Sequence, residues 1–247
     1  MNKLYGGVYI PNLANYAEQY GIGQYRFARN YELKGKELVI DAEGKEYTLS
    51  FACCEEAVFN GKKCDWEAEK LSAALYFVRF GGNCGAFCLY GGKAVLCLKG
   101  RKTPICGTIR GYEDAQAPES AGGDMVGTKV RWIFGVNRYV NHEHYAKTKL
   151  RAAWSRNTVN TGSGKTFRDG WEALPEDYNV EEVKAVKLGG PFYLVDISAN
   201  VPEGVCAPAG MNRLVLLEDY DHMMTVGCAF GADMEPIMMA GYAKFLD

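Results

Sequence analysis

The sequence predicts an all-β protein made of two tandem antiparallel β-barrels with a short helical segment near the N-terminus. Short apolar runs with period-two alternation recur along the chain and are separated by glycine-rich turns. The order of these runs in the first half returns in the second half, and a polar stretch rich in Pro and Gly, residues 111–124, lies between them. Many short antiparallel strands form barrels or sandwiches because closure hides unpaired edges, and we expect barrels.

The first half is expected to begin with a short helix over residues 13–20, which Gly21 ends. A β-hairpin follows, with apolar residues at 38–40 and 47–51 joined by a turn at 41–44. Three further apolar runs, separated by glycine-containing turns, extend this hairpin into a meander of at least five strands: residues 74–80, 86–90 and 94–98.

The second half repeats this order, which predicts an internal duplication with domains at residues 1–122 and 123–247. The clearest match sets residues 75–80 beside residues 192–197, and each of these runs precedes a turn or loop and two more expected strands. The other expected strands of the second half are residues 126–134, 138–145, 213–218 and 223–230.

Composition limits the classes of function. The 28 basic and 30 acidic residues nearly cancel, so no field attracts nucleic acid. No apolar run approaches the roughly 18 residues that a membrane-spanning helix needs, and residues 1–20 lack the apolar core of a signal peptide. The nine cysteines form no CxxC pair, which indicates reduced thiols and no structural zinc site, with a nucleophilic cysteine as the alternative. We therefore expect a soluble cytoplasmic protein, either monomeric or homo-oligomeric, that does not bind membranes.

Six segments carry a resemblance to a known family: residues 35–38, 75–78, 142–145, the surroundings of Trp154, 192–195 and 227–231. They resemble the MoaF family, whose members have N- and C-terminal lipocalin-like domains. The resemblance covers nearly the whole chain. It implies a lipocalin-like fold with a ligand pocket for the two halves, and it transfers no catalytic residue.

His142 and His144 are the leading candidates for catalysis. Residues two apart in a strand face the same side of a sheet, so both imidazoles are expected to line one surface. Imidazole titrates near neutral pH, and Tyr145 is the adjacent group that would orient a phenol or a carbonyl. A metal site needs a third ligand such as His222, and the HExxH pattern is absent, so no metal is predicted. The alternative is a pair of surface histidines on a hairpin.

Charged and aromatic residues of the apolar runs are the candidates for ligand binding. Arg79 and Asp196 occupy equivalent places in the matched runs, and a charge inside a barrel is costly unless it is paired or used. The alternative is that both face outward, toward solvent or the other half. Tyr76, Trp154 and Tyr193 would suit an aromatic ligand, although the same residues would equally build an ordinary core.

Two other segments are polar and carry weaker indications of a site. Residues 161–166 end like a phosphate-binding loop, but Val159 stands where that pattern requires Gly, so we expect a surface loop and no nucleotide cofactor. Residues 218–222 place three carboxylates and an imidazole together, and they are interpreted as a polar turn, with a cluster at a barrel mouth as the alternative.

Together these features predict a cofactor-independent enzyme that acts on a small aromatic molecule by acid–base chemistry of the lyase, hydratase or isomerase type. The alternative of a different class is a non-catalytic lipocalin-like protein that sequesters or delivers a hydrophobic metabolite. The least specific alternative is an accessory protein for a partner enzyme. The second half contains all three histidines, so we expect the working site there.

Overall fold

All the secondary structure that the computed structural model describes is β-strand, in residues 3–5, 8–10, 25–135, 138–155, 179–201, 205 and 207–246. The all-β prediction is therefore confirmed for these residues. The helix predicted over residues 13–20 lies outside the described residues. A separate hairpin is formed by β1 (Lys3–Tyr5) and β2 (Val8–Ile10).

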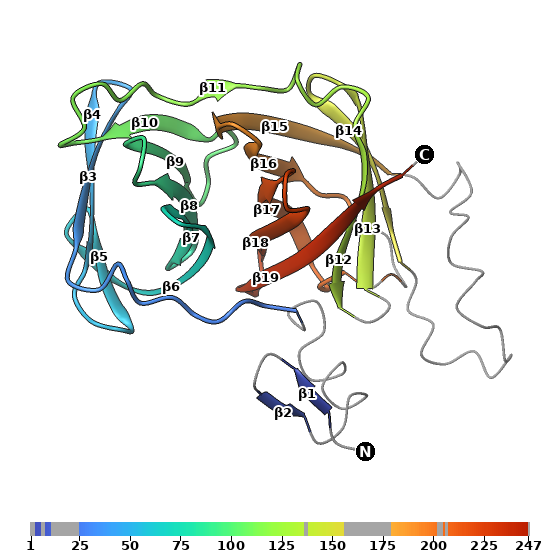
Figure 1. Ribbon diagram of the computed structural model, residues 1–247, viewed down its shortest axis with the longest axis horizontal. Helices are drawn as coiled ribbons and strands as arrows, with labels where there is room; N and C mark the ends of the chain where they lie inside the picture. Colours follow the sequence, from blue (N-terminus) through green and yellow to red (C-terminus); the bar gives the residue numbers. More distant parts are fainter. Residues whose placement is uncertain are drawn as a thin grey trace, which may run out of the picture.

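The first barrel is a closed meander of eight antiparallel strands (Figure 1). Each strand pairs with the next, and the last pairs with the first. The strands are β3 (Glu37–Ala42), β4 (Lys45–Phe51), β5 (Glu56–Phe59), β6 (Lys62–Ser72), β7 (Leu75–Phe80), β8 (Asn83–Cys88), β9 (Lys93–Cys97) and β10 (Ile105–Ile109). Asn60 and Gly61 join β5 to β6 with φ angles of 47° and 78°, because a two-residue hairpin turn that matches the strand twist needs positive φ at both positions.

The second barrel has the same plan. Its strands are β12 (Lys129–Gly135), β13 (Arg138–Ala146), β14 (Lys149–Trp154), β15 (Asn179–Gly189), β16 (Phe192–Ser198), β17 (Met211–Asp219), β18 (Met224–Gly231) and β19 (Met234–Phe245). Each again pairs with the next, and β19 pairs with β12 to close the barrel. The short strand β11 (Glu119–Ser120) adds to β15 from outside this ring.

The repeated strand order confirms the internal duplication. The two matched runs of the sequence fall on β7 and β16, each of which is the fifth strand of its barrel. The boundary placed after residue 122 falls between β11 and β12.

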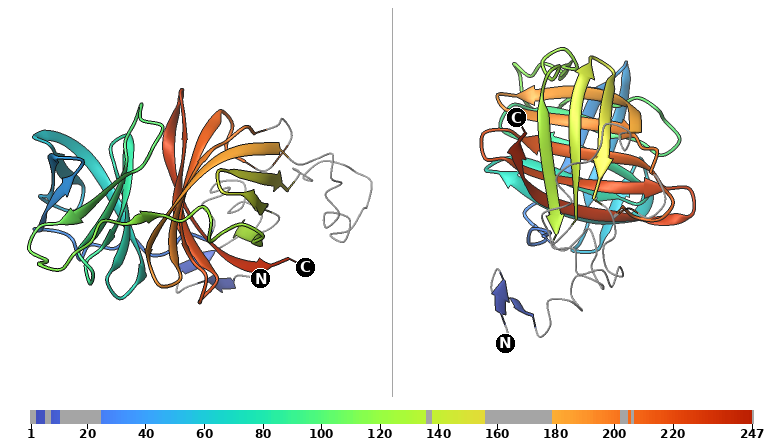
Figure 2. Two further views of the ribbon diagram at one scale, coloured as in Figure 1. Left: turned by 90° about the horizontal axis from the view of Figure 1, so that it is seen from above. Right: turned by 90° about the vertical axis from the view of Figure 1, so that its right-hand side faces the viewer.

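The two barrels lie side by side and share a buried apolar seam (Figures 1 and 2). Outward-facing side chains of β6–β9 pack against outward-facing side chains of β15–β19 in one continuous core cluster. Its largest members include Leu75, Phe77, Leu194, Leu217 and Met238. Strands at the seam are consequently buried on both faces, with one face toward the barrel interior and one toward the other barrel.

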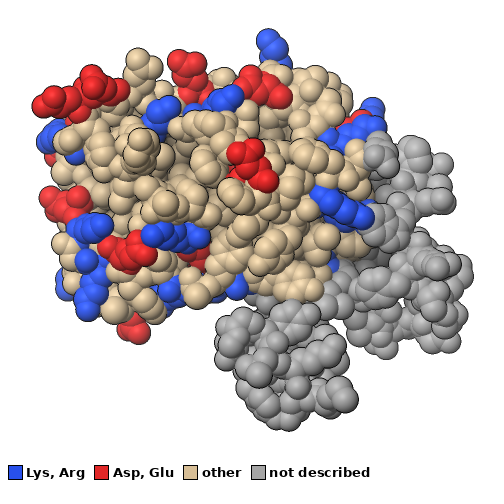
Figure 3. Space-filling view, in the orientation of Figure 1, with Lys and Arg blue, Asp and Glu red and all other residues tan. Residues whose placement is uncertain are grey.

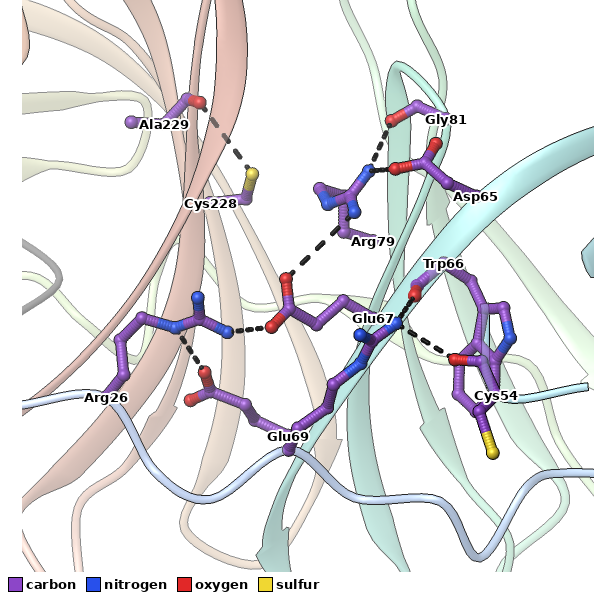
Figure 4. A network of polar contacts seen from close by, with 11 residues as sticks. Arg26, Cys54, Asp65, Trp66, Glu67, Glu69, Arg79, Gly81, Cys228 and Ala229 are labelled. Atoms are coloured by element: carbon purple, nitrogen blue, oxygen red, sulfur yellow. Dashed lines mark hydrogen bonds and ion pairs between the residues drawn. The ribbon is translucent and has the colours of Figure 1, made fainter. Parts of the chain in front are cut away.

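A polar network crosses the edge of the seam (Figure 4). Residues 25–35 run along both barrels, since Tyr25 N donates to the Phe134 carbonyl and Asn30 N donates to the Ala68 carbonyl. Between these two points, Arg26 forms ion pairs with Glu67 and with the fully buried Glu69, the latter at 2.9 Å. Burial raises the pKa of Glu69, and the charge of Arg26 opposes that rise.

A second ion pair, in which only the carboxylate is buried, joins Arg213 of β17 to Asp196 of β16. The Arg213 Nε and Nη2 atoms donate to the two Asp196 carboxylate oxygens at 2.8 and 2.7 Å. Arg213 Nη1 also donates to the Leu98 carbonyl of the first half at 3.0 Å, so the guanidinium bridges the two barrels.

Replacing Arg213 with Met is expected to lower the free energy of unfolding by about 3 kcal/mol or more, because it leaves the Asp196 carboxylate buried without its cation. The double variant Arg213→Met/Asp196→Leu should recover much of that loss. Urea denaturation measures both. Arg110→Met is the matched control, since its pair with Asp41 is exposed and screened by solvent, so its loss should be much smaller. Equal losses in the two single variants would contradict a buried bridge.

Candidate functional site

His142 and His144 point into the second barrel. They alternate along β13 with Val140, which belongs to the core of that barrel. Their cross-strand partners on β14 are Ala152 and Leu150, which belong to the same core. Only 1% of His142 and 2% of His144 is exposed. The prediction that both imidazoles share one face is confirmed, and that face is the barrel interior.

Within the part of the chain that the structure describes, neither histidine has all of its ring nitrogens hydrogen-bonded. Both ring nitrogens of His142 and Nε2 of His144 lack hydrogen-bond partners, and each of these atoms exposes less than 1 Å². The two rings lie edge to face, with centroids 6.4 Å apart. Burial, with a smaller contribution from His144, lowers the pKa of His142 to about 3, and burial lowers the pKa of His144 to about 4. Both rings are therefore neutral at pH 7, and each carries one N–H donor and one acceptor nitrogen.

Glu181 of β15 faces the same interior. It pairs across the sheet with Leu150, which in turn pairs with His144, so these three residues form one row across neighbouring strands. Glu181 is 3% exposed, and its Oε1 accepts a hydrogen bond from Asn200 N at 3.2 Å. Burial raises the pKa of Glu181 to about 7, a value suited to proton transfer at neutral pH.

Glu218 faces the interior from the opposite wall. Its strand β17 lies four strands from β13 in either direction around the ring. Leu214 and Leu216, which alternate with Glu218, belong to the interior core, and the cross-strand partners of Glu218 are Tyr193 and Thr225. Glu218 is fully buried, and burial raises its pKa to about 8, which the hydrogen bond from Tyr220 only partly opposes.

Tyr220 closes a cage of rings beside Glu218. Its hydroxyl donates to Glu218 Oε2 at 2.9 Å. Its ring lies 5.9 Å from Trp132, 5.7 Å from Tyr193 and 6.1 Å from Phe245, measured between centroids. Among the described residues, the buried indole N–H groups of Trp132 and Trp154 and the buried Glu218 Oε1 have no hydrogen-bond partner. The second barrel therefore combines an aromatic lining with several unpartnered polar atoms.

Two of the ligand-binding candidates join this site. Trp154 pairs with Val140 across the sheet and belongs to the interior core. Tyr193 packs against that core from β16. Tyr145 follows His144 on β13 and points to the opposite, outward face, where it is 39% exposed. Its ring centroid lies 4.9 Å from the guanidinium carbon of Arg151. Tyr76 lies in the first barrel, where its hydroxyl donates to Glu32 at 2.6 Å.

Arg79 and Asp196 lie outside both barrels, at the seam. Arg79 contacts Asp65 at 2.7 Å and Glu67 at 4.0 Å (Figure 4), and Asp196 pairs with Arg213. Arg79 also lines a groove of about 670 Å³ between the barrels, to which Arg213 contributes from the other side. Both candidate charges are thus neutralised by neighbours and face the other half rather than a barrel interior.

The sequence singles out neither Glu181 nor Glu218 as a site residue. Glu218 ends the expected strand 213–218 and begins the segment 218–222, which is interpreted as a polar turn with a cluster at a barrel mouth as the alternative, and the observed strand continues to Asp219. The strand that carries Glu181 was not identified. The alternation of Glu181, Val183 and Ala185 on one face is the period-two pattern that would have found it.

The described residues contain no group of three or more His, Cys, Asp and Glu side chains placed to hold a metal ion. No helix long and apolar enough to cross a membrane occurs in the same part of the chain. On the face drawn in Figure 3, basic and acidic side chains are interspersed rather than separated.

The fold and its interior define a protein of two β-barrels, the second of which encloses acid, imidazole and aromatic side chains. Comparison with known proteins does not extend this description, since no family model matches the chain and a search of curated proteins finds no match.

The free energy of unfolding is expected to depend on pH through Glu218. Its pKa is about 8 in the folded protein and 4.5 when unperturbed, so the folded state holds a proton that the unfolded state releases between these values. Stability should therefore fall as pH rises from about 4.5 to about 8, by on the order of 2 kcal/mol or more. Glu181, whose pKa is also raised, contributes to the same decline. His142 and His144 lower stability only below about pH 6.5, because there the histidines of the unfolded chain are protonated while those of the folded protein stay neutral.

Urea denaturation across this pH range tests the assignment. Glu218→Gln should flatten part of the decline, because the amide has no proton to lose. Glu143→Gln, a change on the same wall as the histidines but with its side chain paired to Arg151 near the surface, is the control and should leave the slope unchanged. An unaltered slope in Glu218→Gln would contradict a buried, protonated carboxyl.

Proposed function

We propose that the second barrel is the site of a cofactor-independent enzyme that acts on a small aromatic molecule by acid–base chemistry of the lyase, hydratase or isomerase type. The observation that carries the proposal is a pair of buried, neutral imidazoles with three ring nitrogens that have no hydrogen-bond partner among the described residues, set among aromatic side chains. A buried polar group without a hydrogen bond destabilises a protein by about 1–3 kcal/mol. These buried imidazoles destabilise the fold by themselves. A ligand that forms hydrogen bonds with their free nitrogens would explain why the protein contains them.

Glu181 is the residue best suited to transfer a proton. Its pKa of about 7 allows it to accept and return a proton near neutral pH, whereas His144, with a pKa of about 4, is a weak base in the free protein. The strands that carry Glu181 and His144 are two strand spacings apart, about 10 Å. Side chains that converge from this separation can contact one ring between them. We assign His144 and His142 to positioning the substrate through hydrogen bonds, while Tyr145 faces away.

The first barrel supports no equivalent proposal. Its interior is an apolar core that includes Phe51, Trp66, Phe80 and Phe87. Two polar groups of that core have hydrogen-bond partners, because the Tyr76 hydroxyl donates to Glu32 and Trp66 Nε1 donates to the Cys53 carbonyl at 2.8 Å. Duplication followed by divergence accounts for one packed barrel and one polar barrel.

A substrate must displace side chains to reach the site, because the unpartnered atoms expose less than 1 Å² each. Binding then selects a conformation that is a minor one in the free protein, and the apparent affinity is reduced by the fraction of protein in that state. Slow, saturable association is the kinetic consequence.

The domain type, the family and the cellular location are also part of the proposal. On the sequence resemblance we further propose lipocalin-like domains and membership of the MoaF family, and two closed up-and-down barrels are the architecture that this resemblance implies. The eight cysteines of the described residues are free thiols, which favours a reducing, cytoplasmic location.

A second candidate function is a non-catalytic protein that sequesters or delivers a hydrophobic metabolite. The low pKa values of both histidines favour it, since neutral imidazoles bind well but are weak bases. This function predicts a ligand that co-purifies unchanged with the protein and raises its melting temperature.

The test begins with a thermal-shift screen of phenols, catechols, aryl ketones and arylamines, followed by a turnover assay on the compounds that stabilise the protein. The variant His142→Leu/His144→Leu should lower turnover at least about 100-fold, on the scale of a lost acid–base or positioning group. The same variant should unfold at a higher temperature than the wild-type protein, because it removes unpartnered polar atoms from an apolar setting.

Tyr145→Phe is the matched control for this experiment, because it lies on the same strand, faces outward and should keep full turnover. Full turnover in the double histidine variant would sink the enzyme proposal, and a bound compound that is never converted would favour the carrier.

A further inference from the structure

We infer that Glu218 and Tyr220 together form a hydrogen-bond donor site for a carbonyl oxygen, so that the molecule bound in the second barrel is an uncharged aromatic ketone or aldehyde. This inference rests on the proposed site, and it adds a binding residue and a substrate class to it.

The geometry of the pair fixes which oxygen of Glu218 is available. Oε2 accepts the hydrogen bond of the Tyr220 hydroxyl at 2.9 Å, while Oε1 has no partner. In a protonated carboxyl group the carbonyl oxygen is the better acceptor, so Oε2 takes that role and the proton resides on Oε1. Glu218 thus presents an O–H donor toward the barrel interior.

The surroundings keep that proton in place. Glu218 is fully buried, and its side chain forms no ion pair in the part of the chain that the structure describes. Its cross-strand neighbours, Tyr193 and Thr225, are uncharged. Thr225 uses its own hydroxyl as a donor to the Leu217 carbonyl, so it does not compete for Oε1. Burial, the largest influence on the pKa of Glu218, favours the neutral acid.

The rings around Tyr220 indicate where an aromatic ligand would lie. Trp132, Tyr193 and Phe245 surround the Tyr220 ring at centroid distances of about 6 Å. Phe245 is 59% exposed, so this cage reaches the surface at the end of β19. A ring that enters here replaces one aromatic contact with another and brings its oxygen toward Glu218 Oε1.

The four acid and imidazole groups of the interior supply no positive charge to a ligand near neutral pH. His142 and His144 are neutral, and Glu181 and Glu218 hold protons or, at higher pH, negative charge. A carboxylate would meet no cation among these four groups and would be repelled by either acid once ionised. A carbonyl accepts a hydrogen bond without bringing a charge into the barrel, which makes it the matching group.

The experiment compares three probes of one ring size: naphthalene, 2-acetylnaphthalene and 2-naphthoate. Quenching of tryptophan fluorescence reports their affinities, since Trp132 and Trp154 line the interior. The ketone should bind about fivefold to tenfold tighter than naphthalene, the value of one hydrogen bond. The carboxylate should bind more weakly than either. Tighter binding of 2-naphthoate, or no preference for the ketone, including no binding of any probe, would overturn the inference.

Two substitutions at Glu218 distinguish the loss of the hydrogen-bond donor from a loss of folding. Glu218→Leu should abolish the preference for the ketone and leave the affinity for naphthalene unchanged within about twofold, because only one hydrogen bond is lost. Glu218→Gln retains an N–H donor and should keep most of the preference, also above about pH 8, where the wild-type protein loses it as Glu218 ionises. Thermal unfolding shows whether each variant folds. If Glu218→Leu does not fold, the ketone preference of Glu218→Gln above about pH 8 tests the inference on its own.

The outcome is distinguishable from failure of the enzyme proposal. If the ketone binds with the expected dependence on Glu218 but no aryl ketone or aldehyde is converted, the donor site stands and the enzyme proposal fails. If a substrate is converted equally well by the wild-type protein and Glu218→Leu, the enzyme proposal stands and the donor site is wrong.

Discussion

The pairing of β12 with β19 is the constraint on which the second half depends. This pairing closes the ring of strands and so decides which side of every strand faces inward. With period-two alternation, an inward Val140 requires inward His142 and His144, and an inward Leu216 requires an inward Glu218. The polar side chains therefore lie in the interior as a consequence of barrel closure. Burying these polar side chains destabilises the fold, and the burial of the apolar residues with which they alternate offsets that loss.

The same closure operates in the first barrel with a different result. There, β10 pairs with β3, and the inward positions are filled by apolar and aromatic side chains that leave a packed core. The seam then joins the two barrels through the outward faces of their long strands. The polar and imidazole groups of the proposed site thus lie in one of two copies of one architecture, while the other copy is packed with apolar side chains.

The sequence was informative wherever one face of a strand differed from the other or a turn had distinctive chemistry. The hairpin at residues 38–51 was predicted from its alternation, and the match between residues 75–80 and 192–197 located equivalent strands. The shared face of His142 and His144 followed from their spacing alone. For Arg79 and Asp196 alternation gave no direction, because β7 and β16 are apolar on both faces where they meet the seam.

The two acids were harder to anticipate. Glu218 ends an expected strand but is followed by Asp219, Tyr220 and Asp221, a composition typical of turns, so the sequence does not show that Glu218 faces the barrel interior. The raised pKa values of Glu218 and Glu181 depend on how completely distant strands bury them, and that burial is a property of the closed barrel rather than of any short segment.

The most direct test of this account is a side-chain NMR titration of the protein labelled with ¹⁵N at histidine. Only three histidines contribute signals, and the third, His222, is exposed, which distinguishes it from the two buried rings. The account predicts that His142 and His144 remain neutral down to about pH 5, well below the ordinary pKa of about 6.5, and that both signals shift when an aromatic ligand binds. Ordinary titration of both residues near pH 6.5, with no response to any bound ligand, would contradict a polar site inside the second barrel.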